Sequence, residues 1–172
     1  MYKHFLKPIL FRFNPETAHN MTFKGLSFLR HIPFAQAIIR SIYKKEYPRL
    51  EREVFGIHFP NPVGLAGGLD KNGEFYNDMA NFGFGFVEIG SLTPLPQDGN
   101  AKPRCFRVPE DKALINRFGI NNKGVKNAVE HLKKVHPEVI VAANISKNTT
   151  MIVPAHNIPA FKPAKEFLEK VK

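Results

Sequence analysis

Three short apolar segments separated by amphipathic stretches dominate the middle of the chain. The nearly continuous apolar runs at residues 63–66, 84–90 and 139–144 predict strands, and the first of them is expected to be buried. Residues 74–82 and 122–135, which lie between them, place apolar side chains at helical spacing. Alternating strands and helices of this kind indicate a parallel sheet covered by helices. Functional side chains are then expected at the carboxyl ends of the strands, whether the sheet is open or a barrel.

Two connections frame this unit. Apolar residues surround Gly56 in residues 54–59, which predicts a hairpin turn or bulge that ends at Pro60 and Pro62. A long loop rich in Pro, Gly and Asn is expected between the second strand and the helix at 122–135.

The N-terminal region is predicted to be helical. Residues 5–13 carry an apolar stripe at spacings of three and four. Asn14, Pro15 and Glu16 are typical of a helix start, with Asn as the cap and Pro in the first turn. Residues 31–33 interrupt this helix, and residues 34–43 form another short amphipathic pattern. Charges occur too often for a spanning helix, and no signal-peptide layout is present.

Charge adds a second property to these helices. The chain has a net charge of +10, and residues 1–49 hold nine basic against two acidic side chains. The helices therefore either pack on their own domain or dock on an anionic membrane surface, and the charge asymmetry favours the membrane. Nucleic-acid binding lacks any recognition motif. A single cysteine excludes an internal disulfide, and the histidines show no metal-ligand spacing.

The strand ends carry the candidate chemistry. The first strand is followed by Gly67, Gly68, Leu69, Asp70 and Lys71, where two glycines would expose the backbone to a planar ligand and the lysine would face an anion.

The other two strands lead into residues 90–94, with Ser91, and residues 144–148, with Asn144. Hydroxyl and amide groups can hold the polar edge of a heterocycle, although each of these residues alone could be a strand-end cap. Residues 114–124 combine three asparagines with two glycines in a long connection, which is typical of a binding loop. Asn121 and Asn122 could cap the next helix, but Asn116 lies too far upstream.

These blocks resemble the amino-terminal half of quinone-linked (class 2) dihydroorotate dehydrogenases. The matching segments are residues 1–3, 14–19, 61–74, 83–97, 99–124 and 144–148, in order. The resemblance implies a partial (β/α)8 TIM barrel with about three strands, preceded by a small helical membrane-docking domain. Expected domains are residues 1–49 (membrane and quinone), 50–150 (first part of an FMN-binding barrel) and 151–172 (divergent tail).

The resemblance also implies a function, namely FMN-dependent oxidation of dihydroorotate to orotate in pyrimidine biosynthesis, with ubiquinone or menaquinone as electron acceptor. It implies a peripheral location on the cytoplasmic face of a bacterial inner membrane, since no presequence precedes Met1. The alternative is a non-catalytic remnant that acts as a membrane-associated module.

Residue roles follow by position. Gly67, Gly68, Leu69, Asp70, Lys71, Ser91 and Asn144 would contact FMN, and Lys71 with Asn116, Arg117, Phe118, Gly119 and Ile120 would bind orotate. The family base falls in a later segment, so no catalytic base is assigned here. Ser146 stands where the family usually has Gly, and the sequence after Thr150 departs from the family pattern.

Overall fold

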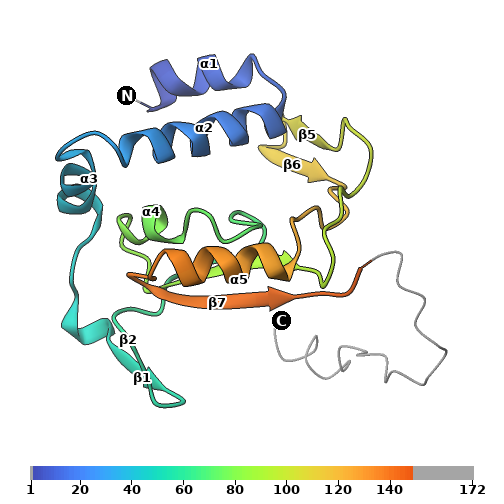
Figure 1. Cartoon of the computed structure of the whole chain (residues 1–172). Coiled ribbons are helices and arrows are strands. Elements are labelled where there is room, and N and C mark those ends of the chain that lie inside the picture. Colours follow the sequence, from blue (N-terminus) through green and yellow to red (C-terminus); the bar gives the residue numbers. More distant parts are fainter. Residues whose placement is uncertain (1, 149–172) are drawn as a thin grey trace, which may run out of the picture.

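The computed structural model describes residues 2–148, so the tail predicted at 151–172 lies outside the described part. A π-helical turn (η1, Tyr2–Leu6) leads into α1 (Lys7–Phe11), α2 (Pro15–Leu29) and α3 (Ala35–Tyr43). As predicted, Asn14 caps α2, because its Oδ1 accepts a hydrogen bond from the Glu16 N–H at 3.0 Å. Figure 1 shows α1 lying along α2, with α3 at the far end of α2. Within residues 2–148, no helix is long and apolar enough to cross a bilayer.

A 3₁₀ turn (η2, Pro48–Leu50) leads from these helices to the predicted hairpin. Strands β1 (Arg52–Val54) and β2 (Ile57–Phe59) pair antiparallel, with Val54 opposite Ile57. Phe55 and Gly56 both have positive φ (53° and 72°), as a tight two-residue turn requires. The hairpin reaches the sheet through Phe59, whose ring meets that of Phe86 edge-on at 5.7 Å.

The three predicted strands form one parallel sheet. Strands β3 (Gly64–Leu65), β4 (Phe86–Leu92) and β7 (Ile140–Ile145) lie in the order β3-β4-β7, and Val87 of β4 pairs with Leu65 on one side and Val141 on the other. Helices α4 (Tyr76–Ala80) and α5 (Val125–Lys134) connect them. Both helices begin two or three residues later than predicted, because turns held by Asp70 and Asn122 occupy the preceding residues.

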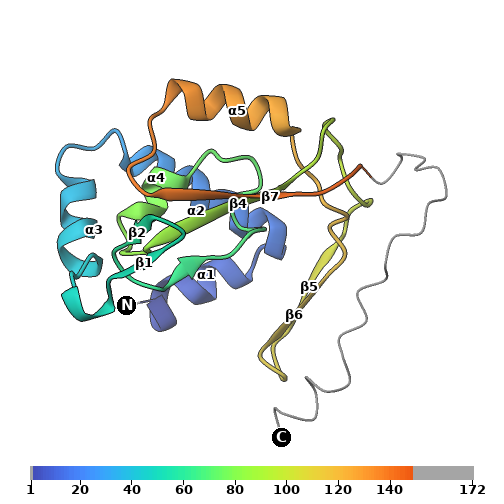
Figure 2. The same ribbon diagram turned by 90° about the horizontal axis from the view of Figure 1, so that it is seen from below.

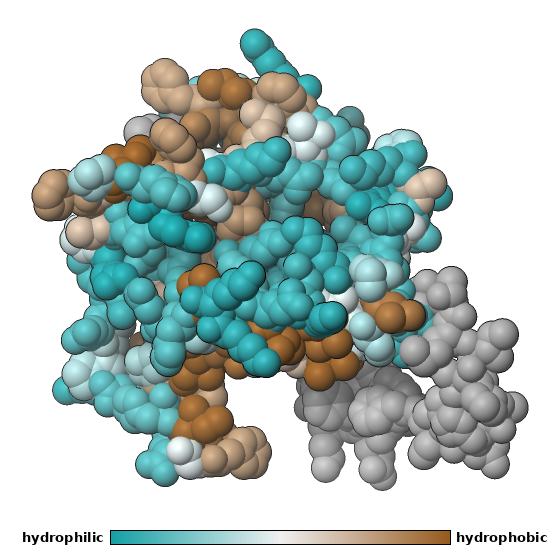
Figure 3. Space-filling model, in the orientation of Figure 1, coloured by the Kyte–Doolittle hydropathy of each residue, from teal (hydrophilic) through white to brown (hydrophobic). Residues whose placement is uncertain are grey.

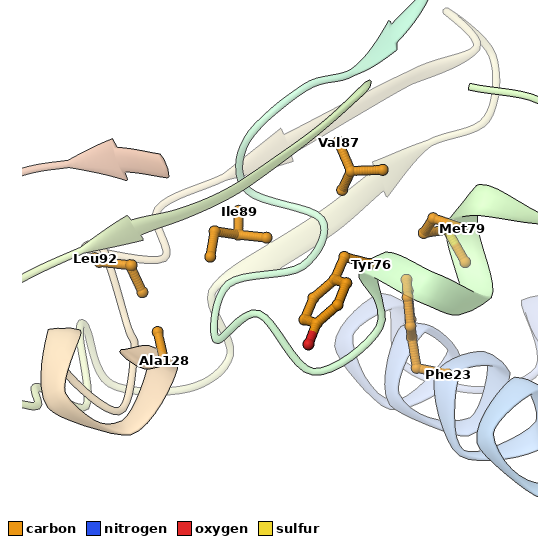
Figure 4. Close-up of a cluster of buried hydrophobic side chains, with 7 residues drawn as sticks. All are labelled: Phe23, Tyr76, Met79, Val87, Ile89, Leu92 and Ala128. Carbon is orange, nitrogen blue, oxygen red and sulfur yellow. The ribbon is translucent and has the colours of Figure 1, made fainter. Parts of the chain in front are cut away.

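The core lies between β4 and the helices. Val87, Ile89 and Leu92 point to this side and are buried, each fully buried side chain contributing about 1.5–3 kcal/mol. Their partners come from α2, α4 and α5, as Figure 4 shows: Phe23, Tyr76, Met79 and Ala128. The opposite face of β4 carries Glu88 and Ser91. The core therefore orients the strand so that polar groups face the other way.

One element was not predicted. The region interpreted as a long loop contains an antiparallel hairpin, β5 (Cys105–Val108) and β6 (Ala113–Asn116), with Cys105 opposite Asn116. Figure 2 shows this hairpin extending away from the parallel sheet. The prediction of a loop at residues 114–116 was therefore wrong. The nearby prolines and glycines suggested a loop and hid two four-residue strands. These strands pair with each other and not with the main sheet.

Candidate functional site

The glycine turn presents bare backbone at the end of β3. Gly68 has φ +99°, and the position that a Cβ would take there has no atom within 4 Å. Two backbone hydrogen bonds tie the turn to β4: Gly68 N–H to Gly90 O at 2.6 Å, and Gly90 N–H to Asp70 O at 2.9 Å. The turn is fixed while the surface beside Gly68 stays open. A flat ring can approach a backbone exposed in this way.

The Asp70 side chain stabilises the turn from its buried side. Its side chain is buried, and its two oxygens accept hydrogen bonds from Glu74 N–H (2.9 Å) and Phe75 N–H (2.8 Å). Burial raises the pKa of this carboxyl, while the backbone donors of Glu74 and Phe75 lower it. The Asp70 side chain therefore supports the start of α4, and only the rest of the turn faces the open side.

Lys71 places a cation beside that open side. Its Nζ donates to Gly68 O at 2.6 Å and lies 4.7 Å from the centre of the Phe118 ring. Burial lowers the pKa of Lys71, the Arg104 charge lowers it further, and Glu16 acts in the opposite direction. Among residues 2–148, no carboxylate oxygen lies within 4 Å of Nζ. A ligand anion would find a partly desolvated cation that has no acidic partner within residues 2–148.

Ser91 and Asn144 meet across β4 and β7. Ser91 Oγ donates to Asn144 Oδ1 at 2.6 Å, and Asn144 Nδ2 donates to Glu88 Oε1 at 2.8 Å. Gly67 borders the same group, because a Cβ there would come within 2.8 Å of Glu88 Oε1. Glu88 fixes which way the Asn144 amide points, which leaves Ser91 Oγ free to accept.

Only some residues of the predicted binding loop face the cleft. Asn116, Phe118 and Ile120 line the same cleft as Lys71. Arg117 turns away and donates to Pro103 O at 3.2 Å, and Gly119 O accepts from Gln97 Nε2 at 3.1 Å.

The prediction that Asn121 or Asn122 caps the next helix is wrong, because α5 begins at Val125 with Gly124 as its N-cap and has no side-chain cap. Asn122 is buried instead, and it bonds Thr93 N–H at 3.1 Å and Gly124 N–H at 2.8 Å.

The N-terminal helices close the cleft. It has a volume of about 1020 Å³ and runs between the glycine turn, β5–β6 and helices α1 and α2. That volume is at the upper end of the range for small-molecule sites. Sequence reasoning did not assign its helical lining, which includes Leu10, Phe11, Glu16, His19 and Phe23. Glu16 and His19 are three apart on one helical face, a spacing that could have indicated a shared surface.

Arg107 of β5 joins the cleft to these helices. Its Nη1 donates to Phe13 O at 2.7 Å, and its guanidinium carbon lies 4.5 Å from the centre of the Phe11 ring. His19 lies beside Phe23 at 4.7 Å between ring centres, and burial lowers the pKa of its imidazole, with the Lys71 charge adding to the effect. At neutral pH this end of the cleft therefore combines aromatic surface, a neutral imidazole and the Arg107 guanidinium.

Comparison with known proteins places the chain. Residues 49–167 match the sequence profile of dihydroorotate dehydrogenase. Dihydroorotate dehydrogenase (quinone) of Christiangramia forsetii is 49% identical over 148 residues, which is 86% of this chain and 43% of that protein. The protein of the same name from Cellvibrio japonicus is 48% identical over 150 residues, covering 87% and 42%. The chain thus spans less than half the length of these curated relatives.

Solved structures agree on the fold. The crystal structure of the Eimeria tenella enzyme in complex with ferulenol matches with a TM-score of 0.64 and 34% identity, over 81% of this chain and 38% of that one. The ligand-free form from the same organism gives the same TM-score. The parallel strands β3, β4 and β7 are accordingly part of the barrel of that fold. From sequence and fold together, the chain belongs to the dihydroorotate dehydrogenase family, and the two curated relatives compared above are members that carry the name dihydroorotate dehydrogenase (quinone).

Proposed function

We propose that this chain provides the first half of the flavin and orotate site of a quinone-linked dihydroorotate dehydrogenase. The observation that carries the proposal is Lys71, a half-buried cation without a carboxylate within 4 Å in the described part of the chain. It lies between a bare glycine backbone and a loop of polar residues. Dihydroorotate and orotate are carboxylates, and a fixed lysine is suited to hold them. No residue of this half is proposed as the catalytic base.

The strand ends fit FMN. Bound FMN would supply the hydride acceptor in this chemistry. The open backbone at Gly67–Gly68 offers a surface for its ring, and Ser91 Oγ offers an acceptor because its proton is directed to Asn144. We place Leu69 and the Asp70 backbone along the same contact. The Asp70 carboxylate stays committed to the start of α4.

The substrate would lie against Lys71 and the 116–120 loop. Asn116 and Phe118 both reach the cleft, one with an amide and the other with a ring that can shield a flat heterocycle from water. Arg117 and Gly119 would act through the loop backbone, since their own bonds run to Pro103 and Gln97.

The helical unit, residues 1–49, would dock on the anionic cytoplasmic face of a bacterial inner membrane and admit ubiquinone or menaquinone. Figure 3 shows apolar side chains gathered on the surface over α1 and around α3. Exposed members include Phe5, Ile9, Phe28, Phe34, Ile38 and Ile42. Such a surface together with nine basic residues is typical of interfacial helices.

The test of the flavin and substrate site uses the purified 172-residue chain. A visible flavin spectrum and orotate binding by calorimetry are expected, and Lys71→Gln should weaken orotate binding at least about tenfold, as for loss of a charged hydrogen bond. Lys126→Gln on the outer face of α5 is the matched control and should bind as wild type. A colourless chain that ignores orotate would contradict the proposal for this chain.

A non-catalytic membrane module is the second candidate, and the exposed apolar helices favour it. Sedimentation with anionic vesicles distinguishes membrane binding through the helices from binding through the rest of the surface. Phe28→Ser with Phe34→Ser should reduce sedimentation, whereas Phe55→Ser, at the 99% exposed tip of β1–β2, should not. Membrane binding without any flavin would favour this module over the enzyme. Equal sedimentation by all variants would contradict docking through the helices.

A further inference from the structure

A buried arginine lies between the N-terminal helices and the proposed substrate loop. Arg104, next to β5, is only 6% exposed. Its Nη1 donates to two loop carbonyls, Asp98 O at 2.6 Å and Asn100 O at 3.0 Å. Its Nε donates to Glu16 Oε2 at 3.1 Å and its Nη2 donates to Glu16 Oε1 at 2.7 Å, and we call this two-bond contact the fork. A buried guanidinium with every nitrogen engaged holds its neighbours in one geometry.

The loop side of this contact leads to Lys71. The guanidinium carbon of Arg104 lies 5.4 Å from the centre of the Phe118 ring, and Lys71 Nζ lies 4.7 Å from the same centre. The Asn100 N–H donates to Phe118 O at 3.0 Å, and the Arg117 N–H donates to Arg104 O at 2.8 Å. Phe118 is therefore fixed by the segment that Arg104 organises.

The helix side of the contact leads to the first turn of α2. Glu16 is on that turn, and its side chain is largely buried. Lys102 Nζ also approaches Glu16, but at 3.5 Å and with a side chain 68% exposed. A charged partner that lies mostly in solvent, as Lys102 does, contributes little. The buried fork of Arg104 is thus the strong ionic link between α2 and the loop.

We propose that Arg104 is a positioning residue of the substrate site, through which the seating of α2 sets Phe118 and, through Phe118, the environment of Lys71. The inference rests on the proposed function for the role of Lys71, but its geometry does not. It makes the site responsive to the helical unit: when α2 shifts, Glu16 shifts Arg104, and the ring over Lys71 follows. Lys71 thereby becomes better hydrated or better shielded without any change in its own sequence neighbours.

The titration of Lys71 reports this arrangement directly. We would label lysines with ¹³C-methyl groups, assign Lys71 with Lys71→Arg, and follow its signal against pH in the 172-residue chain. Arg104→Lys keeps the charge but loses the fork. Lys71 is then less buried, and burial is what disfavours its protonated form. The Lys71 pKa should therefore rise towards its ordinary value of 10.5. Phe118→Leu removes the ring but leaves the bonds between Arg104 and Glu16. It should also move the Lys71 pKa away from the wild-type value, because both the cation–π contact and the shielding by the ring change.

Amide exchange provides a second measurement. Both Arg104→Lys and Glu16→Gln should speed exchange at Asn100 and Arg117 by about tenfold, as expected when a charged hydrogen bond is lost. Lys102→Gln, which removes the exposed partner of Glu16, is the matched control and should leave both measurements at the wild-type value. Thermal melts confirm that each variant is folded. If Arg104→Lys does not fold, Glu16→Gln and Phe118→Leu decide the question.

The outcomes separate the two proposals. A folded Arg104→Lys chain with unchanged Lys71 titration and unchanged exchange at Asn100 and Arg117 would overturn the positioning role. The same result for Phe118→Leu and Glu16→Gln would overturn it if Arg104→Lys is unstable. A wild-type chain that ignores orotate, but whose Lys71 responds to Arg104→Lys as expected, would contradict the proposed function alone.

Discussion

Gly68 shows how one missing side chain defines a surface. Its φ of +99° is costly for any other residue, yet a Cβ there would meet nothing within 4 Å. Gly68→Ala should therefore destabilise the chain by about 1–3 kcal/mol through backbone strain alone. It should also weaken flavin binding, because the methyl group separates a flat ring from the backbone. Urea unfolding measures the first effect and flavin fluorescence the second.

Gly25 provides the control for this prediction. It lies inside α2 with open space around its Cβ position and no positive φ. Gly25→Ala should stabilise the helix by about 0.5–1 kcal/mol and leave flavin binding unchanged. Equal stability of Gly68→Ala and wild type would show that the turn relaxes without strain.

Which residues of the site can be read from sequence depends on what each contributes. Gly68 and Lys71 are local, because a turn and a cation occupy consecutive positions. Asp70 is predicted to approach the cofactor by its backbone, and the separate role of its buried carboxylate, which bonds to the start of α4, could not be read from the sequence. Arg104 and Glu16 are 88 residues apart, and their pairing follows from how β5 packs on α2. No spacing rule contains that information.

At the scale of elements, Tyr76 ties α4 to the end of α5. The ring is buried in the core, and its hydroxyl donates to Val135 O. Tyr76→Phe keeps the packing but leaves that carbonyl without its donor, which should cost about 1–3 kcal/mol. Chemical denaturation measures the loss. The exposed Tyr47→Phe should cost nothing, and an unchanged midpoint for Tyr76→Phe would mean that water replaces the hydroxyl.

The ion pair between α2 and Arg104 predicts acid sensitivity at this contact. The Arg104 hydrogen bonds hold the pKa of Glu16 below its ordinary value of 4.5, against a smaller opposing effect of burial. Because the folded state favours the charged carboxylate, its contribution is complete above pH 4.5 and is lost as pH falls through the lowered folded pKa. Removing one member of such a buried pair costs about 3 kcal/mol near neutrality.

Glu16→Gln isolates this contribution. The difference in unfolding free energy between wild type and Glu16→Gln should be largest near pH 7 and shrink below pH 4.5. Lys102→Gln should follow the wild-type pH dependence. A wild-type advantage that is constant from pH 7 to pH 3 would show that Glu16 acts through packing and not through its charge.

Element prediction succeeded where one periodicity covered one element. The parallel strands, α3 and α5 each follow one apolar pattern, α2 was predicted from its start at Asn14, Pro15 and Glu16, and the structure confirms all of these elements. The β5–β6 hairpin was missed because Pro103 and Pro109 flank a four-residue strand and suggested a loop. The burial pattern of β5 changes only between Cys105, which is buried, and Phe106, which is exposed, whereas Arg107 and Val108 are both partly exposed. A period-2 signal over four residues is too short to outweigh two prolines.

At the scale of the whole molecule, the parallel sheet ends in an exposed edge strand, β7. Within residues 2–148, β7 pairs only with β4, and Ile145 of β7 is 71% exposed. Strand edges with free backbone groups tend to pair with another chain. The net charge of +10 opposes association at low salt but is screened as salt increases. We therefore expect self-association that increases with both protein concentration and salt.

Ile145→Lys tests whether the strand edge is responsible. A lysine on this edge adds charge where a second copy would pair, so sedimentation velocity should show less association at equal concentration and salt. Leu95→Lys is the matched control, because Leu95 is 65% exposed on a loop outside the sheet, and the net charge changes equally. If both substitutions reduce association alike, net charge alone governs it. If only Ile145→Lys does so, the copies meet along β7, and flavin binding by Ile145→Lys then reports on the single chain.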